Sequence, residues 1–441
     1  MNARINKAEV TCYDVAVVGG GLAGLTAAIY AARGGKSVVV LERSEALGGR
    51  ARSFEHEGTV FNLGGHALYQ KSEAAPIFKE LGVTYTGTIP SPNGNLAMYQ
   101  EKLNFLPGGF LSMLRTRLIT PKQKLALMPI MIAMATAKTK PLYNVSLRMW
   151  VEGKTNDPIL RDLLYGIFRI TNYANAPDLQ SAGAALEQVQ KALRGNVKYV
   201  DGGWQSLVDS LAQRAEDAGV HVITGARVSR VTTTNGRVTG VALQDGSSIQ
   251  ASHVILTTPP RTSASFVESD AHAYLNAWAD KLKPSKAACL DLALTHLPDP
   301  KVQFVLGLDE PYYLSVHTRY AKLGEPSQVM LHTLKYLPPD HSQSTEELRQ
   351  ELESYLDRFQ PGWRELTLHQ QFLPSMIVSH AIVTTTMHGP MGRPSPEVPG
   401  TRGLWLAGDW VQSNGMLADA AVASGKQAAF KVLEQSPVHV A

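Results

Sequence analysis

Residues 13–24 read YDVAVVGGGLAG, an apolar run that ends in a glycine-rich turn. Residues 25–33 favour a helix, and residues 37–42 read SVVVLE, a second apolar run that ends in an acid. This order predicts a strand, a turn, a helix and a second strand. Such a unit holds the diphosphate of a dinucleotide at the helix N-terminus, where unpaired N–H groups and the helix dipole attract an anion. The alternative is a glycine turn without a ligand.

Each glycine of this unit, and the acid that follows it, has a separate structural role. Gly19 permits the tight turn, Gly21 lets the diphosphate approach the backbone, and Gly24 lets the helix pack closely against the strand. Glu42 lies 18 residues after Gly24, where a carboxylate accepts hydrogen bonds from an adenosine ribose. The residues that we expect to contact the cofactor here are Gly19, Gly21, Leu22, Ala23, Gly24 and Glu42.

The run that follows, ERSEALGGRARS at 42–53, resembles the extended signature of the flavin amine oxidase and phytoene desaturase superfamily. In that superfamily an acid-arginine pair leads to a Gly-Gly-Arg turn that touches the FAD diphosphate. The residue chemistry agrees, because two glycines free the backbone and Arg50 adds a planar cation that pairs with phosphate oxygens. The alternative for Arg50 is an ordinary surface cation. The resemblance implies FAD contacts at Arg43, Gly48, Gly49 and Arg50.

The C-terminal part carries a second match. Residues 404–409 read LWLAGD, which predicts a buried strand ending in a glycine turn, and NGMLAD at 414–419 leads into a helix of small residues. The stretch is similar to the superfamily's closing motif, in which a Gly-Asp pair binds the ribityl chain and diphosphate. The helix N-terminus there faces the flavin pyrimidine and stabilises negative charge on the ring. The resemblance implies contacts at Gly408, Asp409, Met416 and Leu417.

A third segment lies in the middle of the chain. DGGWQSL at 201–207 precedes an expected helix at 208–218 and an expected strand at 220–223. In the family this region passes the adenine, which implies a contact with the backbone of Val228. Residues 252–260 resemble the strand that returns to the cofactor domain. The resemblance therefore spans nearly the whole chain and implies FAD as the cofactor.

The chain of 441 residues is too long for one core and suits two domains. We predict an α/β fold with a Rossmann-type, glutathione reductase-like FAD-binding domain and a second α+β substrate domain. The FAD-binding domain is expected to be discontinuous, formed by residues 1–75, 197–265 and 400–441. The two insertions, 76–196 and 266–399, are expected to build the substrate domain.

The insertions differ in pattern. The first favours helices at 160–170 and 182–193, where apolar residues recur near the helical period. The second favours strands at 286–294, 302–308 and 328–334. Ser344 and Glu347 predict a capping box for a helix that reaches Phe359.

Composition excludes several classes. Hydrophobic content is 44% and charged content 18%, which is globular, and a net charge of +4 gives no argument for nucleic acid. Two cysteines cannot form a metal framework and fit a reducing compartment. We see neither a signal-peptide core before the first strand nor a run of 18 apolar residues. We therefore expect a cytoplasmic protein without a metal.

Residues 125–135, LALMPIMIAMA, are strongly apolar but too short to span a bilayer. Pro129 is expected to interrupt or start a helix. We favour a helix that lines the substrate cavity or packs in the core. The alternative is a peripheral membrane contact that admits lipid-like substrates. The flanking cations are Lys122, Lys124, Lys138 and Lys140.

FAD carries the redox step, so the protein's task is to place a substrate C–H bond near the flavin N5. His66 lies in NLGGHALY at 62–69, which in the family passes the flavin face. The branch with hydroxysqualene dehydroxylases carries a similar glycine-histidine. The resemblance implies cofactor contacts at Gly64, Gly65 and His66, and His66 is a candidate acid or base. The alternative is a histidine that hydrogen-bonds the cofactor or backbone.

Lys286 is the second catalytic candidate. Amine oxidases place a lysine on a comparable strand, where it holds a water near N5. Here Lys286 precedes an apolar strand in a similar position. The alternative is a surface cation at the strand entry.

The closing motif departs from amine oxidases, because residues 413–417 contain no aromatic side chain. An aliphatic Met416-Leu417 floor suits a hydrocarbon-like substrate. We predict an FAD-dependent oxidoreductase that dehydrogenates or desaturates an apolar small molecule by hydride transfer to N5. The alternatives are an amine oxidase that forms imine and hydrogen peroxide, a flavin-dependent isomerase without net redox, and a flavin-binding protein without activity. We find no second dinucleotide turn that would indicate an NAD(P)H site, so the electron acceptor is open: oxygen, a quinone or another acceptor.

Overall fold

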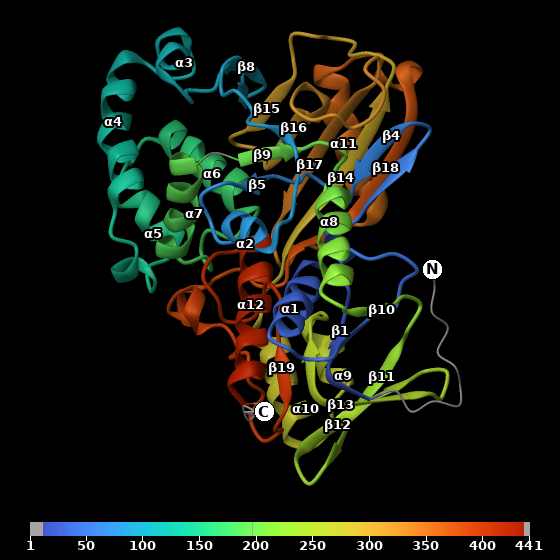
Figure 1. The fold of residues 1–441 in the computed structure, drawn as a ribbon. Coiled ribbons are helices and arrows are strands. Elements are labelled where there is room, and N and C mark those ends of the chain that lie inside the picture. The colour runs from blue at the N-terminus through green and yellow to red at the C-terminus, as the bar shows by residue number, and fades with distance from the viewer. Residues whose placement is uncertain (1–11, 196, 436–441) are drawn as a thin grey trace.

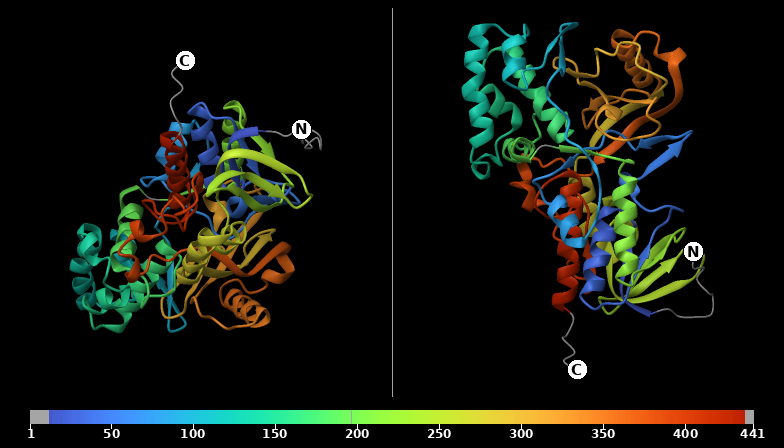
Figure 2. Two further views of the ribbon diagram at one scale, coloured as in Figure 1. Left: turned by 90° about the horizontal axis from the view of Figure 1, so that it is seen from below. Right: turned by 45° about the horizontal axis from the view of Figure 1, so that its top comes forward.

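The computed structural model describes residues 12–195 and 197–435, and the outer ends of the predicted domain segments, 1–11 and 436–441, lie outside this range. Two large β-sheets organise the described chain (Figure 1). Both Figure 1 and Figure 2 show a group of helices beside the second sheet at one end of the molecule, with the first sheet and its helices at the other end.

The first sheet has the order β10-β2-β1-β13-β12-β11, and β19 also pairs with β13. Strands β10, β2, β1, β13 and β19 are parallel, whereas β11 and β12 are antiparallel additions. The strands are β1 (Cys12–Val18), β2 (Val38–Leu41), β10 (His221–Ile223), β11 (Val228–Thr234), β12 (Arg237–Leu243), β13 (Ser248–Leu256) and β19 (Leu404–Leu406).

This sheet is covered on both faces, which explains its continuous apolar strands. Val15 and Val17 pack into one core, while Ala16 and Val18 pack into the other, because successive side chains point to opposite faces. The first core is completed by α1 (Leu22–Arg33), α2 (Ala74–Leu81), α8 (Gln205–Asp217) and α12 (Leu417–Gln435). The second core is completed by β11, β12, α9 (Pro260–Ser265) and α10 (Ser269–Lys281).

The second sheet has the order β18-β14-β17-β16-β15-β7-β8. Helix α11 (Thr345–Phe359) covers one of its faces, and the predicted capping box is confirmed, with the Ser344 N–H donating to Glu347 Oε2 over 2.7 Å. The strands are β7 (Leu96–Tyr99), β8 (Lys102–Phe105), β14 (Ser285–Leu294), β15 (Phe304–Gly307), β16 (Tyr312–Val316), β17 (Val329–Leu337) and β18 (Thr367–Ser379).

In the described part of the chain, short strands form two further small sheets. Strand β3 (Ser53–His56) pairs with β4 (Thr59–Asn62). Strand β9 (Val197–Val200) pairs with both β5 (Leu68–Tyr69) and β6 (Gly87–Thr88).

The group of helices beside the second sheet comes from the first insertion. The two helices predicted there, at 160–170 and 182–193, are confirmed as α6 (Pro158–Asn172) and α7 (Ala182–Gly195). Their apolar residues pack into two adjoining cores. The helices are α3 (Phe110–Arg115), α4 (Pro121–Thr136), α5 (Leu147–Glu152), α6 (Pro158–Asn172) and α7 (Ala182–Gly195).

The prediction that Pro129 interrupts or starts a helix was wrong. Helix α4 begins at Pro121, after a cap in which Thr120 Oγ1 accepts the Gln123 N–H, and continues through Pro129. Burial of Leu127, Ile130 and Met134 holds the helix together although Pro129 lacks a backbone donor. Within the described residues, we find no helix with the length and apolarity needed to cross a bilayer.

The strands of the first sheet all come from the segments predicted to form the FAD-binding domain, and those of the second sheet from the two insertions. Helix α10 lies in the second insertion by sequence, yet its Ala271 and Leu275 pack into a core of the first sheet. The domain boundaries themselves stay a prediction.

Candidate cofactor-binding and active site

A cavity of about 1090 Å³ lies where the glycine turn, the C-terminal motif and the second sheet meet. Most of the residues predicted from the sequence line it. They are Gly19, Gly21, Leu22, Ala23, Glu42, Arg43, Gly48, Gly49, Arg50, Gly65, His66, Val228, Gly408, Asp409 and Leu417. The structure therefore brings segments from both ends of the chain to one cavity.

The glycine turn has a geometry that leaves room for a ligand. A Cβ at Gly24 would lie 2.0 Å from the Gly19 carbonyl oxygen, so this glycine serves the contact between helix and strand. A Cβ at Gly21 would meet nothing nearer than the Gly48 oxygen at 3.7 Å. Helix α1 begins directly after Gly21 without a side-chain cap. Its first N–H groups therefore remain available to an anion.

Glu42 is 8% exposed and supports the turn from β2. Its Oε2 accepts the Gly20 N–H and its Oε1 accepts the Ser44 N–H, both over 2.8 Å. A carboxylate has about four lone-pair positions, so two stay available to hydroxyl donors. These residues fit the adenosine and diphosphate parts of FAD.

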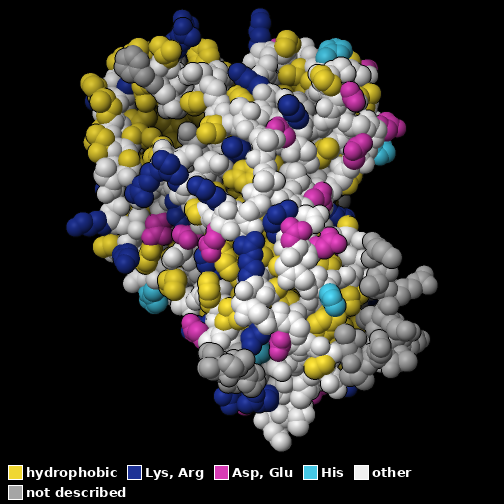
Figure 3. Space-filling model, in the orientation of Figure 1, with side chains coloured by type: hydrophobic (Ala, Val, Ile, Leu, Met, Phe, Trp, Pro, Cys, Tyr) yellow, Lys and Arg dark blue, Asp and Glu magenta, His cyan; other side chains and the backbone are white. Residues whose placement is uncertain are grey.

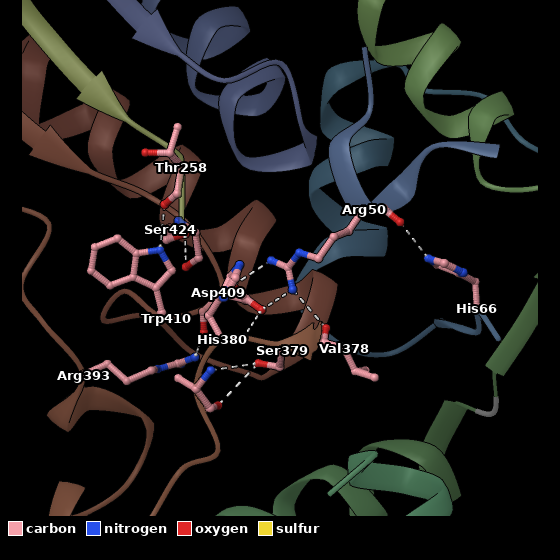
Figure 4. Close-up of polar contacts among 12 residues, drawn as sticks. Arg50, His66, Thr258, Val378, Ser379, His380, Arg393, Asp409, Trp410 and Ser424 are labelled. Carbon is pink, nitrogen blue, oxygen red and sulfur yellow. Dashed lines mark hydrogen bonds and ion pairs between the residues drawn. The ribbon is translucent and has the colours of Figure 1, made fainter. Parts of the chain in front are cut away.

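The Gly48-Gly49-Arg50 turn is tied to the glycine turn by the Gly48 N–H, which donates to the Gly20 oxygen over 2.8 Å. Gly48 and Gly49 have φ of 114° and 55°, a backbone conformation in which residues other than glycine are strained. The Arg50 guanidinium leaves this turn and donates to both Asp409 oxygens, over 2.8 and 2.9 Å (Figure 4).

Asp409 carries a buried negative charge. Burial alone would raise the pKa of its carboxyl, but the Arg50 guanidinium and His380 lower that pKa well below its usual range, and hydrogen bonds from Arg50 and from the His380 backbone N–H add to the effect. The buried Arg393 donates to the Asp409 carbonyl oxygen over 2.7 Å and also to the carbonyls of Ser413 and Gly415. Arg393 therefore holds the closing loop together.

His66 contacts the backbone with both ring nitrogens. Nδ1 lies 2.8 Å from the Gly64 oxygen and Nε2 lies 3.2 Å from the Arg50 oxygen. Its ring packs against Trp204 with 4.7 Å between centroids. Burial lowers the pKa of His66, while the two carbonyls oppose that shift. These contacts fit the alternative of a histidine bonded to the backbone, and His66 also borders the cavity.

Lys286 is not among the residues that line the cavity. Along β14, Cys289 and Asp291 pack toward the cavity side, where Cys289 Sγ would lie 3.7 Å from a Cβ at Gly64. Side chains alternate along a strand, so Lys286 lies on the opposite face with Ala288 and Leu290. The geometry therefore gives no support to a role for Lys286 beside a flavin.

Three other predicted residues border the cavity only indirectly. Gly24 lies behind the turn, and Gly64 lies where a side chain would collide with Met376 at 2.4 Å. Met416 packs with Ala184 and Val383. Only Leu417 of the predicted aliphatic floor lines the cavity.

Sequence reasoning missed several lining residues. They come from separate segments of the chain, and no motif marks most of them. Trp204 is the one that a motif could have indicated, because it directly follows the glycine pair at 202–203. The missed residues include Tyr69, Tyr173, Trp204, Leu373, Met376, His380, Trp410 and Asp419.

The fold and the site define a class: an α/β protein whose described part has two large sheets and whose cavity is lined by the N-terminal glycine turn and by the C-terminal motif. The family model for flavin-containing amine oxidoreductases matches residues 22–433, and the chain belongs to this family. Its cofactor is FAD, and it is an FAD-dependent oxidoreductase.

Curated relatives are similar over part of their length. The chain is 26% identical over 276 residues to 4,4'-diaponeurosporene oxygenase of Staphylococcus aureus (strain USA300), covering 55% of this chain and 54% of the relative. It is 27% identical over 285 residues to hydroxyneurosporene desaturase of Cereibacter sphaeroides, covering 56% of each. The chain thus spans about half the length of the curated relatives it matches.

A solved structure shares the fold over almost the whole chain. An oxidoreductase from Methanosarcina mazei superposes with a TM-score of 0.74 at 19% identity, covering 96% of this chain and all of that one. At this identity the likeness concerns the fold alone.

Gly21→Ala is expected to leave the apoprotein folded and to weaken FAD binding by about tenfold or more, because its Cβ meets free space that the diphosphate needs. Titration of apoprotein with FAD, followed by flavin fluorescence, measures this. Gly108→Ala, at a glycine with similar free space outside the cavity, is the control. Equal FAD affinity of Gly21→Ala and wild type would contradict the assignment.

Asp409→Asn is expected to remove an acid-sensitive part of the stability. A lowered pKa means that Asp409 stabilises the fold above the unfolded value of about 3.9, and this contribution disappears as the pH falls further. The variant should melt at least about 2 °C below wild type at pH 6, and the gap should narrow progressively as the pH falls below about 4. Asp280→Asn, whose side chain is 68% exposed, should show neither effect. A gap independent of pH would refute this account.

Proposed function

We propose that this FAD-dependent oxidoreductase desaturates or dehydrogenates an apolar small molecule. The observation that carries the proposal is the wall of the cavity beyond the glycine turn. It is formed mainly by hydrocarbon and aromatic side chains, namely Leu63, Leu68, Tyr173, Leu373, Met376 and Ile377. Such a wall favours an apolar ligand. The names of two curated relatives, a desaturase and an oxygenase of neurosporene-type compounds, support the same substrate class.

The carboxylates of the cavity argue against a substrate ammonium. Glu42 holds backbone N–H groups, and Asp409 is paired with Arg50. Asp419 accepts the Ala74 N–H over 2.8 Å, and burial raises the pKa of its carboxyl to about 6. Asp409 and Asp419 are already paired, and the remaining lone-pair positions of Glu42 are assigned to the ribose of FAD, so none of the three is placed to bind an amine. An amine oxidase remains the second candidate because of the family description.

The residue roles follow from this proposal. The first turn of α1, Arg50 and Asp409 would hold the diphosphate and ribityl parts of FAD, Glu42 the ribose, and Val228 the adenine. His66 is the candidate acid or base, and its place on the cavity wall, where Lys286 is not found, supports this choice. When bound, FAD supplies the acceptor for two electrons and one hydrogen. The final acceptor is oxygen or a quinone.

We further propose a cytoplasmic protein that contacts membranes through α3 and α4. Residues 102–151 contain no Asp or Glu, but eight cations: Lys102, Arg115, Arg117, Lys122, Lys124, Lys138, Lys140 and Arg148. Large apolar side chains are exposed on α4, which lies within this stretch, with Leu125 70% and Ile132 61% exposed. Figure 3 shows hydrophobic side chains gathered over this end of the molecule, with Lys and Arg around them. Cations beside exposed apolar groups suit an anionic lipid surface.

Anaerobic mixing tests the reaction. Enzyme loaded with FAD should be bleached by diaponeurosporene or hydroxyneurosporene supplied in vesicles, and not by putrescine or other primary amines. His66→Gln should slow the bleaching about 100-fold if His66 moves the substrate proton, whereas His296→Gln, at an exposed loop histidine, should not. Bleaching by amines alone would favour the amine oxidase, and product without bleaching or acceptor use would favour an isomerase.

Flotation with vesicles tests the membrane contact. Wild-type protein should bind vesicles of phosphatidylcholine with 30% phosphatidylglycerol, bind less at high salt, and bind pure phosphatidylcholine weakly. Leu125→Asp combined with Ile132→Asp should abolish binding, because both side chains are largely exposed. Leu368→Asp, at a leucine 42% exposed on β18, is the control. Equal binding of the double variant would reject this surface.

A further inference from the structure

A row of polar residues crosses the second sheet at one level. Gln371 on β18, Asp291 on β14, His332 on β17 and Ser315 on β16 are direct neighbours in the strand register. Asp291 and His332 have side chains only 1% exposed, and His332 Nδ1 lies 2.7 Å from Asp291 Oδ1. A buried carboxylate and imidazole in the middle of an apolar sheet are costly to maintain. This pair therefore needs an explanation that packing does not supply.

The pair is connected to the cavity wall by hydrogen bonds. Gln371 Nε2 donates to Asp291 Oδ2 over 3.1 Å and to the Asn62 carbonyl over 2.9 Å. Asn62 directly precedes the cavity-lining Leu63, and its Oδ1 accepts the Trp204 N–H over 2.9 Å. Trp204 in turn packs against His66.

A second imidazole lies between the pair and the cavity. His317, in a 3₁₀ turn at His317–Arg319, has its ring centroid 4.0 Å from that of His332 and stacks on Tyr199 at 4.4 Å. Its Cε1 would be 3.9 Å from a Cβ at Gly65, which lines the cavity. Burial, with His332 and His66 adding to it, holds the pKa of His317 well below its usual range, so this ring is neutral.

Two nitrogens of these rings have no hydrogen-bond partner among the described residues. Within the described part of the chain, Nε2 of His317 and Nε2 of His332 are both buried without a hydrogen-bond partner. The Asp291 carboxylate accepts from Nδ1–H of His332, which leaves Nε2 with its lone pair, the orientation that a carboxylate imposes on a catalytic histidine. A proton taken up at Nε2 would create a neutral ion pair with Asp291.

We propose that the Asp291–His332 pair, with His317 beside it, stores one proton when the bound flavin is reduced. Desaturation breaks two C–H bonds: one hydrogen leaves with its electron pair to the flavin, and the other leaves as a proton while its electrons form the C=C bond. Reduction thus adds negative charge to a poorly solvated cavity. A proton held at His332 Nε2 compensates this charge close to where it arises. Asp291 and His332 are positioning and charge-compensating residues, and they do not touch the substrate.

The groups that face the pair are few. They are His317 and His66 on the cavity side, Tyr199 from β9, and Cys289 two residues before Asp291 on the same face of β14. Burial raises the pKa of both Tyr199 and Cys289, so these two groups stay neutral near pH 7. We therefore assign the proton to the pair itself, at Nε2 of His332, which is buried without a hydrogen-bond partner among the residues that the structure describes.

The test uses the FAD-loaded protein without substrate, so it is independent of which compound is oxidised, although it rests on the redox function proposed above. The midpoint potential of the bound FAD is measured with mediators between pH 6 and pH 8. For a two-electron couple, one extra proton corresponds to 29.6 mV for each tenfold change in proton concentration. Wild type should therefore show a slope steeper by about 30 mV per pH unit than His332→Gln or Asp291→Asn. His296→Gln should match wild type.

Equal slopes in wild type and both variants would overturn the proposal and leave the pair as a structural contact. If the variants do not retain FAD, a measurement on the wild-type protein alone tests the proposal. In histidine-selective ¹⁵N spectra, one buried histidine should change from neutral to doubly protonated on reduction of the flavin. The absence of such a change would equally overturn the proposal. Neither result depends on the vesicle or substrate assays.

Discussion

The bidentate ion pair between Arg50 and Asp409 joins residues 359 positions apart in the chain. Asp409 is buried, so its charge must be neutralised inside the protein, and Arg50 does this from the N-terminal motif. The pair therefore fixes the Gly48–Arg50 turn against the end of β19. Around it, Arg393 gathers the closing loop, and the Arg50 guanidinium also reaches the Val378 carbonyl on β18 (Figure 4). One contact thus holds the two sheets around a common cavity.

The cavity combines two environments because two sheets contribute to it. The parallel sheet presents glycine backbone and helix N-terminal N–H groups, which suit phosphate. The second sheet presents apolar side chains such as Leu373 and Met376, which suit hydrocarbon. A buried acid-base pair lies directly behind that apolar wall, at Asp291 and His332. Phosphate binding, substrate binding and charge compensation are thereby separated in space, while the segment from Asn62 to His66 touches all three regions.

Local motifs were predictable because their physics is local. The strands β1 and β2, helix α1 and the cap at Ser344 follow from apolar runs, glycine positions and a capping pattern within a few residues. Lys286 shows the limit: one position of strand alternation decides whether a side chain faces the cavity, and the sequence pattern of β14 is apolar on both faces. Pro129 shows a second limit of local patterns, because the buried contacts of α4 outweigh the free-energy cost of a proline inside the helix.

The amino-acid sequence by itself determined the cofactor class, because dinucleotide binding depends on glycines, an acid and an arginine at fixed short spacings. It also determined which segments alternate between the two halves of the fold. Only the tertiary structure decided which side chains meet. Asp291 and His332 are 41 residues apart and look like ordinary strand residues, yet sheet register makes them a buried pair. The exposure of Leu125 and Ile132 was decided in the same way, because packing partners, and not hydrophobicity, determine which apolar residues are covered.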